Sequence, residues 1–482
     1  MPGAAPEAER VPSMARRPEP PSAHTLAPPL ENGEVGRDRR AFGWWRARSW
    51  RFDLAVLARV RNGLQALPDA EPTAADGASP PDQAADPPSQ PDPPAQAPEP
   101  DPAISAIHET FAAVGKAGDE AAAYFYAWLF LRQPALRDLF PPAMDEQRDR
   151  LFRALARVVE SLSTPEELAS YLTQLGQDHR KYGVEPAMYD AVGEALIATL
   201  RAFAGSTFTD DAEQAWLQAY TAASSLMIRG AEQDATARPA FWTAEVVQHE
   251  NRGHGVAVLT VAPDEVLPFT AGQHITVQTP RWPHVWRPYS IASRPRDDGL
   301  LSLHVKAVPG GWVSTALVRD TAPGDELIIG PPLGTMTLHN AADRDLLCIA
   351  GGTGLSPIKA ITEQVIRESS PGGHRQVFLF CGARTRDELY DLRHLWRLTD
   401  AYPWLQLTPV TSDDPAFDGM QGNVGRVAAR YMPHRECEAY VAGPADMVRE
   451  TIRVLRRAGI PGERIHYDDA LLAARPRVGS GT

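Results

Sequence analysis

The chain has 482 residues, 43% hydrophobic and 23% charged, so it can form about three globular domains. Its net charge of −13 argues against a general nucleic-acid-binding protein. Its three cysteines are too few and too widely spaced for a disulfide framework or a zinc site, and they fit a reduced, cytoplasmic protein.

Residues 1–102 differ in composition from the rest of the chain. They are rich in Pro, Ala and charged residues, and we expect a disordered arm followed by a semi-rigid linker. Residues 41–66 interleave Trp and Phe with Arg. This pattern suits a short amphipathic helix that docks on a membrane surface or a partner, but it favours a helix that folds back on the protein or a weakly ordered arm. We find neither an apolar run long enough to span a membrane nor a signal-peptide core.

Helical patterns dominate residues 103–236, which predicts an all-α domain. Pro186 suits the first turn of a helix whose apolar residues recur at spacings of three and four. That stripe consists of Met188, Val192, Leu196, Leu200 and Phe203. Further helices are expected at Tyr124–Leu131, Asp149–Leu162, Pro165–Leu175 and Ala212–Glu232.

At Phe241 the pattern changes to short segments rich in Val, Ile and Thr, separated by turns with Gly and Pro. This change predicts an antiparallel barrel over residues 238–340. The expected strands are Thr243–Gln248, Gly255–Val261, His274–Gln278, Ser302–Val308 and Glu326–Ile329.

Strands alternate with helices over residues 343–475, which predicts a parallel α/β sheet. Its expected strands are Leu346–Ala350, Val377–Cys381, Leu405–Val410 and Ala439–Ala442. Glycines 351, 352 and 354 follow the first strand, and a helix begins near Pro357. Such a turn lets the backbone approach a diphosphate at a helix N-terminus. Alone it is a weak signal, because it is not the full dinucleotide-binding fingerprint.

Only two histidines, His108 and His179, lie in the helical region, so few imidazoles compete as a ligand. His179 ends a helix-like run, and Tyr189 begins the next one. Tyr126 and Phe140 lie in an apolar helix and in the corner after it. A lone histidine is usually a solvated or hydrogen-bonded surface residue, but these neighbours favour a ligand.

Two segments, YFYAWLFLRQPALRDLF and DHRKYGVEPAMYDAVGEAL, resemble the globin domain of flavohaemoglobins. Later motifs stand in the order of the same family, and the resemblance runs from Ala103 to Asp469. It implies an all-α globin with haem b, a six-stranded antiparallel FAD barrel and a parallel α/β domain that binds NAD(P)H. The later motifs are Arg287-Pro288-Tyr289-Ser290, Gly310-Gly311-Trp312-Val313-Ser314, Gly351–Pro357 and Ala442-Gly443-Pro444.

The resemblance implies that His179 is the axial haem ligand, because a neutral imidazole is a strong ligand for iron. In the family a Tyr and a Glu tune this imidazole through hydrogen bonds. Tyr189 matches the Tyr, and Glu232 is the candidate Glu, although Ala231 stands at the directly aligned position. Asp178 replaces the family's basic residue before the ligand.

On the opposite face of the haem, Tyr126 matches the tyrosine that donates a hydrogen bond to bound dioxygen. Gln147 is the expected second polar residue there, and Phe140 would pack on the haem. The alternative for Tyr126 is an ordinary core tyrosine.

In the flavin motif, Arg287 could neutralise the flavin diphosphate, since a guanidinium makes a forked and permanently charged contact. Tyr289 could stack on the isoalloxazine, and Ser290 could hydrogen-bond near its N5. The second motif would hold the diphosphate through Gly311, Val313 and Ser314.

The nicotinamide nucleotide would contact Gly352, Thr353, Gly354, Gly443 and Pro444. Arg384 and Arg386 follow a strand where the adenosine ribose usually sits, which hints at a 2′-phosphate and NADPH rather than NADH. Ala442 replaces the Cys of many relatives. Ala470 stands where a flavin-stacking aromatic is usual, with Tyr467 or a rearranged tail as the substitute.

The resemblance implies an NAD(P)H-dependent nitric oxide dioxygenase that sends electrons through FAD to haem and converts nitric oxide and dioxygen to nitrate. One alternative is a reductase that passes electrons to peroxide, a quinone or another organic acceptor. The other is a haem gas sensor whose Arg/Trp arm recruits a membrane or partner. The oligomeric state stays open.

Overall fold

The computed structural model describes residues 101–338, 344–368, 375–431 and 436–468. The expectations for the N-terminal arm, including residues 41–66, and for Asp469 and Ala470 lie outside these residues. In the described part of the chain, no helix has the length and apolar character needed to cross a membrane.

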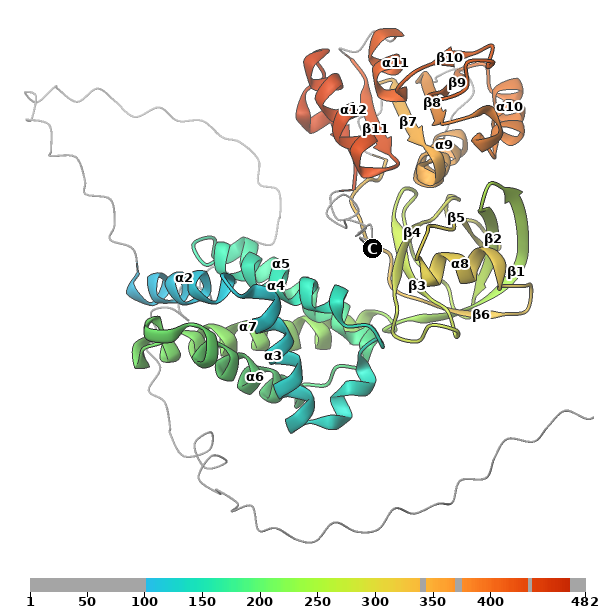
Figure 1. The fold of residues 1–482 in the computed structure, drawn as a ribbon. Helices are drawn as coiled ribbons and strands as arrows, with labels where there is room; N and C mark the ends of the chain where they lie inside the picture. The colour runs from blue at the N-terminus through green and yellow to red at the C-terminus, as the bar shows by residue number, and fades with distance from the viewer. Residues whose placement is uncertain (1–100, 339–343, 369–374, 432–435, 469–482) are drawn as a thin grey trace, which may run out of the picture. The chain divides into compact units, whose positions relative to one another are not determined.

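The first domain is helical, as the sequence predicts (Figure 1). Its six α-helices are α2 (Pro102–Gly115), α3 (Gly118–Arg132), α4 (Asp145–Glu160), α5 (Pro165–His179), α6 (Met188–Phe203) and α7 (Asp210–Ala237). The side chain of Thr209 caps α7 by accepting a hydrogen bond from the amide of Ala212. The helix that Pro186 was expected to start begins two residues later, at Met188, so Pro186 belongs to the preceding turn.

Close packing of α5 against α7 fixes the position of His179. A Cβ atom added at Gly176 would lie 2.0 Å from the carbonyl oxygen of Met227, and one at Gly230 would lie 2.5 Å from that of Thr173. Only glycine therefore permits the two backbones to approach so closely. Since His179 is three residues after Gly176, this contact holds the last turn of α5.

The second domain is a six-stranded antiparallel sheet in the order β4-β3-β6-β1-β2-β5. Its strands are β1 (Trp242–Gly253), β2 (Val256–Pro263), β3 (His274–Gln278), β4 (Arg287–Ser290), β5 (Leu301–Lys306) and β6 (Glu326–Ile329). A bridge between Ile291 and Leu303 brings the two edges of the sheet together. The inward residues form one core, on which helix α8 (Trp312–Arg319) packs. The flavin motif Arg287–Ser290, which was not among the expected strands, is β4.

The third domain is a parallel sheet in the order β10-β9-β8-β7-β11-β12. Its strands are β7 (Leu346–Gly351), β8 (Val377–Ala383), β9 (Leu405–Thr411), β10 (Met420–Gln421), β11 (Glu438–Ala442) and β12 (Ile465–His466). Its helices are α9 (Leu355–Glu368), α10 (Leu392–Ala401), α11 (Val424–Tyr431) and α12 (Ala445–Arg457).

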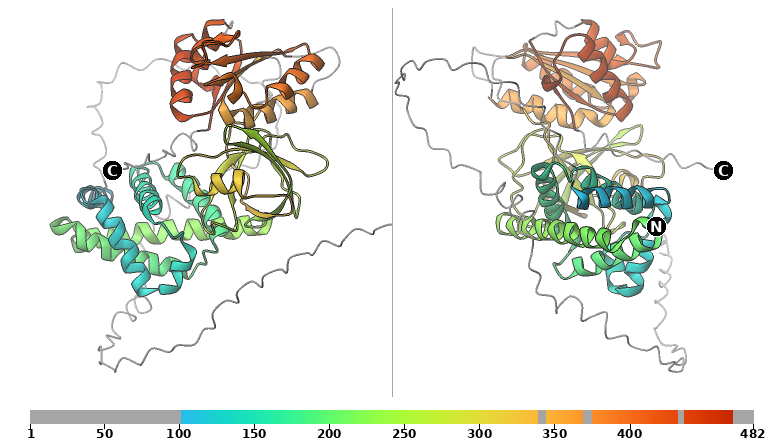
Figure 2. Two further views of the ribbon diagram at one scale, coloured as in Figure 1. Left: turned by 45° about the vertical axis from the view of Figure 1, so that its right-hand side comes forward. Right: turned by 90° about the vertical axis from the view of Figure 1, so that its left-hand side faces the viewer.

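Helices cover both faces of this sheet (Figure 2). Along β7, Leu346, Cys348 and Ala350 belong to the core shared with α9 and α10. The intervening residues Leu347 and Ile349 belong to the core shared with α11 and α12. This alternation buries both faces and explains the continuous apolar run of β7.

The order of the strands reverses at β7, which has β8 on one side and β11 on the other. In doubly wound sheets, ligands bind at such a switch point, beyond the carboxyl ends of the strands. The glycine turns after β7 and β11 touch there. A Cβ atom at Gly354 would lie 2.3 Å from the carbonyl oxygen of Ala442, and one at Gly351 would lie 3.1 Å from a ring carbon of Pro444.

We predict that Gly354→Ala destabilises the third domain by about 2–3 kcal/mol, because the new methyl group collides with the backbone of Ala442. Gly352→Ala is the matched control. It adds a methyl group in the same turn with no atom within 4 Å, and costs only about 1 kcal/mol for the left-handed conformation. Hydrogen exchange of the β7 and β11 amides in the full chain measures both losses. Equal losses would refute the steric argument.

Candidate functional site

His179 lies at the end of α5 in a geometry that suits a haem ligand. Its Nδ1 lies 2.6 Å from the carbonyl oxygen of Leu175, and because a carbonyl only accepts, Nδ1 carries the proton and donates. Nε2 is then the unprotonated nitrogen, which is the form that binds iron. Burial lowers the pKa of this imidazole, which favours the same neutral form. Among the described residues, no group of three or more His, Cys, Asp and Glu side chains could hold a metal ion.

Neither of the two residues expected to tune His179 forms a hydrogen bond with it in the described part of the chain. Tyr189 is the second residue of α6, and its carbonyl accepts a hydrogen bond of 2.5 Å from the Tyr220 hydroxyl. Glu232 is exposed on α7, and within the described ranges no hydrogen bond joins it to His179. The expectation of a carboxylate on the imidazole is therefore not met by this geometry. The Leu175 carbonyl takes that place instead.

A buried carboxylate that sequence reasoning missed lies two residues after Glu232. Asp234 is 8% exposed and pairs with Arg180, the residue directly after His179, and at 2.7 Å with Arg238. A carboxylate this deep in a protein needs such partners. It ties the turn after His179 to the end of α7.

Tyr126 lies on α3 and is 6% exposed, with the ring of Phe140 edge-on at 5.5 Å. Its hydroxyl makes a long contact of 3.5 Å with the backbone carbonyl of Gln147 on α4. The structure thus brings the three expected distal residues together. Burial raises the pKa of Tyr126 to about 12, so its hydroxyl stays protonated and can donate a hydrogen bond.

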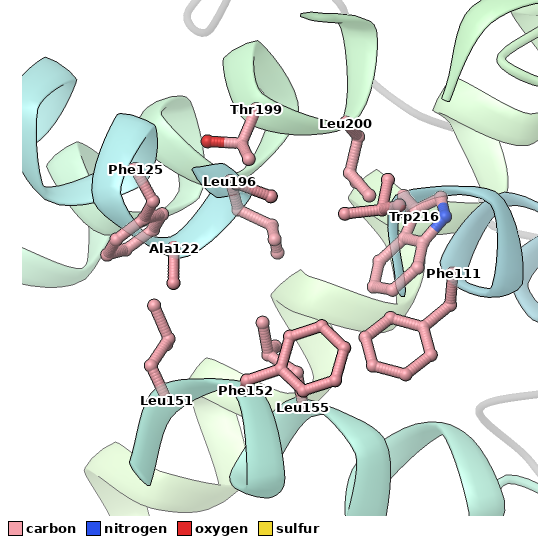
Figure 3. A pocket seen from close by; sticks show the side chains of 12 residues that line it. Phe111, Ala122, Phe125, Leu151, Phe152, Leu155, Leu196, Thr199, Leu200 and Trp216 are labelled. Carbon is pink, nitrogen blue, oxygen red and sulfur yellow. The ribbon is translucent and has the colours of Figure 1, made fainter. Parts of the chain in front are cut away.

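An apolar cavity lies in the same domain, between α2, α3, α4, α6 and α7 (Figure 3). Phe125 and Leu151 on its wall are close in sequence to Tyr126 and Gln147. Two of the side chains that line it carry a polar group, Trp216 and Thr199. The Thr199 hydroxyl already donates a hydrogen bond to the Ala195 carbonyl at 2.7 Å. Apolar cavities of this kind stay dry and accept small apolar molecules.

In the barrel, the flavin motif forms edge strand β4. Arg287 donates to Glu146 of α4 at 2.6 Å, so a flavin diphosphate would replace this carboxylate as its partner. Tyr289 is half-buried on the barrel core, and burial raises its pKa above the ordinary value. Ser290 ends the strand, paired with His274 of β3.

The second flavin motif forms the start of α8, where free amide groups and the helix dipole favour a diphosphate. Gly311 is the N-cap residue, and a Cβ atom there would lie 2.4 Å from Ser314 Oγ. Ser314 Oγ donates to the Gly311 carbonyl at 3.2 Å, and Val313 anchors the helix in the barrel core. These features fit the expected diphosphate cradle.

The expected nicotinamide residues meet at the switch point. Gly352, Thr353 and Gly354 form a tight turn between β7 and α9, and Gly352 has a φ of 55° that favours glycine. Gly443, with a φ of 152°, and Pro444 form the facing turn between β11 and α12.

The loop after β8, which carries Arg384 and Arg386, makes hydrogen bonds to two carboxylates. The exposed guanidinium of Arg384 donates to Glu388 at 2.6 Å, and the amide of Arg386 donates to Asp414 at 3.1 Å. A 2′-phosphate would meet both negative charges, which weakens the argument for NADPH.

Comparisons with known proteins agree with this architecture. Residues 123–227 match the globin family, residues 243–338 the oxidoreductase FAD-binding domain, and residues 348–452 the oxidoreductase NAD-binding domain. A flavohemoprotein of Chromobacterium violaceum is 26% identical over 76% of this chain and 96% of the relative. The ferredoxin–NAD(P)(+) reductase CarAd of Metapseudomonas resinovorans is 32% identical over 51% of this chain and 75% of the relative.

Other relatives share only part of their length with this chain. It spans 65% of the xylene/toluene monooxygenase electron transfer component XylA of Pseudomonas putida, at 32% identity. Among solved structures, flavohemoglobin from Malassezia yamatoensis with bound FAD and heme matches with a TM-score of 0.62 at 20% identity, over 76% of this chain and 98% of that one.

The chain is therefore a modular oxidoreductase, in which a globin domain for haem precedes an FAD-binding and an NAD-binding domain. Its three domains stand in the same order as in flavohaemoglobins, which it resembles over most of their length, and this order supports an oxidoreductase that passes electrons from NAD(P)H through FAD to haem.

We predict that Tyr126 titrates near pH 12, against about pH 10 for an unperturbed tyrosine. The ultraviolet difference between wild type and Tyr126→Phe measures its ionisation. Between the unfolded and folded pKa values the folded state binds more protons, so the contribution of Tyr126 to stability falls as pH rises through this window and is constant below it. A midpoint near the unperturbed value would mean that the phenol is solvated.

We also predict that Glu388→Gln raises kcat/KM for NADPH relative to NADH by about threefold, the scale of one exposed ion pair. The substitution frees Arg384 and removes a negative charge near the expected ribose. Glu368→Gln, which removes a charge from α9 in the same domain, is the control. An unchanged ratio would show that the ribose lies away from Arg384.

Proposed function

We propose that this protein is a nitric oxide dioxygenase, which uses electrons from NAD(P)H to convert nitric oxide and dioxygen to nitrate. The observation that carries the proposal is the pairing of two groups in one helical domain. His179 offers an unprotonated Nε2, and Tyr126 offers a buried, protonated hydroxyl, with its ring against Phe125 of the cavity wall.

Each group has a defined part in this chemistry. His179 would hold the haem, which supplies a redox-active iron. Tyr126 would donate a hydrogen bond that polarises dioxygen, and Phe140 and the apolar walls would keep water out. Dioxygen and nitric oxide are small and weakly polar, so the apolar cavity in the same helical domain is a suitable reservoir for both.

The reductase half would deliver the electrons. Arg287 and the start of α8 would hold the flavin diphosphate, while the paired glycine turns of the third domain would hold NAD(P)H. The protein's contribution is to bind and orient these groups, since the cofactors carry the redox chemistry.

The test is nitric oxide consumption by the full chain loaded with haem and FAD, under air, with NADH and NADPH in turn. We expect oxygen-dependent conversion to nitrate that falls about tenfold or more in Tyr126→Phe, because one aimed donor is lost. Tyr171→Phe, elsewhere in the helical domain, should keep the full rate, and His179→Ala should abolish it.

A second candidate is a reductase that serves another acceptor, such as peroxide, a quinone or an organic molecule. It is favoured by the exposed position of Glu232, since an imidazole without a carboxylate partner donates less electron density to iron. Oxidation of NAD(P)H at the normal rate while nitric oxide persists would support this candidate and contradict the dioxygenase.

A further inference from the structure

The turn that follows His179 rests directly on the flavin barrel. This turn, Arg180–Tyr182, places Lys181 Nζ 3.3 Å from Thr276 Oγ1 on β3. A Cβ atom at Gly330, directly after β6, would lie 3.5 Å from Cδ of Lys181. The segment that carries the expected haem ligand therefore contacts the domain that carries the flavin motif.

Two aromatic side chains continue from His179 across this contact. The ring centroids of His179 and Tyr182 are 6.4 Å apart at 68°, and those of Tyr182 and Trp286 are 6.2 Å apart at 79°. Both are edge-to-face arrangements within the range of favourable ring contacts. Lys181 Nζ lies 5.4 Å from the Tyr182 ring centroid and 5.6 Å from that of Trp286, so one cation holds both rings.

Trp286 has two features that point to a cofactor. It directly precedes Arg287 of the flavin motif, so the rings end where the flavin site begins. Its side chain is 5% exposed, and its indole Nε1 is buried with no hydrogen-bond partner among the described residues. Buried indole N–H groups normally donate, so this group is available to a bound molecule.

We propose that Tyr182 and Trp286 form an aromatic bridge that couples the flavin electronically to the haem. The inference rests on the electron flow that the proposed function requires. In each transfer the reduced flavin loses one electron and the ferric haem iron gains it, while the two side chains are neither oxidised nor reduced. Their role is to fill the space between the two cofactors with packed aromatic rings. Electronic coupling between donor and acceptor falls more steeply with distance across empty space than across packed atoms.

The test measures a single electron transfer rather than turnover. Carbon monoxide is released by a light flash from partly reduced protein loaded with haem and FAD, and the electron that returns from iron to flavin is timed without nicotinamide. Tyr182→Leu should slow this step about tenfold or more, the scale expected when a reacting geometry is lost. Tyr182→Phe should keep it, since the ring remains. Tyr171→Leu, away from the barrel contact, is the matched control.

Two further measurements separate a loss of electronic coupling from a change in driving force or in flavin reduction. The midpoint potentials of haem and flavin should be unchanged in Tyr182→Leu, and flavin reduction by NADH should keep its rate. Trp286→Leu should reproduce the slow step. Tyr182 is only partly buried, so its variant is informative even if the Trp286 variant fails to fold.

An unchanged transfer rate in Tyr182→Leu would overturn the bridge and would mean that the cofactors exchange electrons directly. That outcome leaves nitric oxide consumption intact, so it is distinct from failure of the proposed function. A slow step accompanied by shifted potentials would also overturn the bridge, because the driving force would then explain the change.

Discussion

Electron transfer between the first two domains depends on where His179 is held relative to the flavin barrel. In the proposed function an electron passes from the second domain to the first, so the proposed haem ligand His179 has to be held close to the flavin motif. Three separate contacts hold it. Glycine packing fixes α5 on α7, Asp234 anchors Arg180, and Lys181 and Tyr182 contact the barrel.

The turn at His179 differs from the pattern that the resemblance led us to expect. The imidazole donates to a backbone carbonyl rather than to a carboxylate, and the residue before it is Asp178. A carbonyl fixes the tautomer and the orientation of the ring as well as a carboxylate does, but it adds no negative charge. The geometry therefore suits His179 to bind iron, and under the proposed assignment the iron would be less electron-rich than with a carboxylate partner.

The sequence predicts the elements better than it predicts their contacts. Strands β3 and β6 were expected with the bounds they have, because their alternation and flanking turns are local signals. Strands β10 and β12 have two residues each and were missed, since so short a run has no period. The contacts of Arg287 with Glu146 and of Tyr182 with Trp286 join residues about a hundred or more positions apart, and no local pattern encodes them.

Helix phase explains why the residues around His179 were harder to place. Each residue turns an α-helix by about 100°, so Ala231 and Asp234 lie on one face of α7, whereas Glu232 between them faces solvent. The carboxylate that reaches the ligand turn is Asp234, which sequence reasoning did not single out. A signal was available in Arg180, because a buried cation beside a haem ligand needs an acidic partner on the facing helix.

The most direct test of the account is anaerobic reduction of the fully loaded protein by NAD(P)H under carbon monoxide, followed by absorbance. We expect the flavin band to bleach and the ferrous carbon monoxide spectrum of the haem to appear afterwards. In His179→Ala the flavin should bleach without this second change. A wild-type protein whose flavin is reduced while its haem stays ferric would contradict the claim that the three domains form one electron-transfer unit.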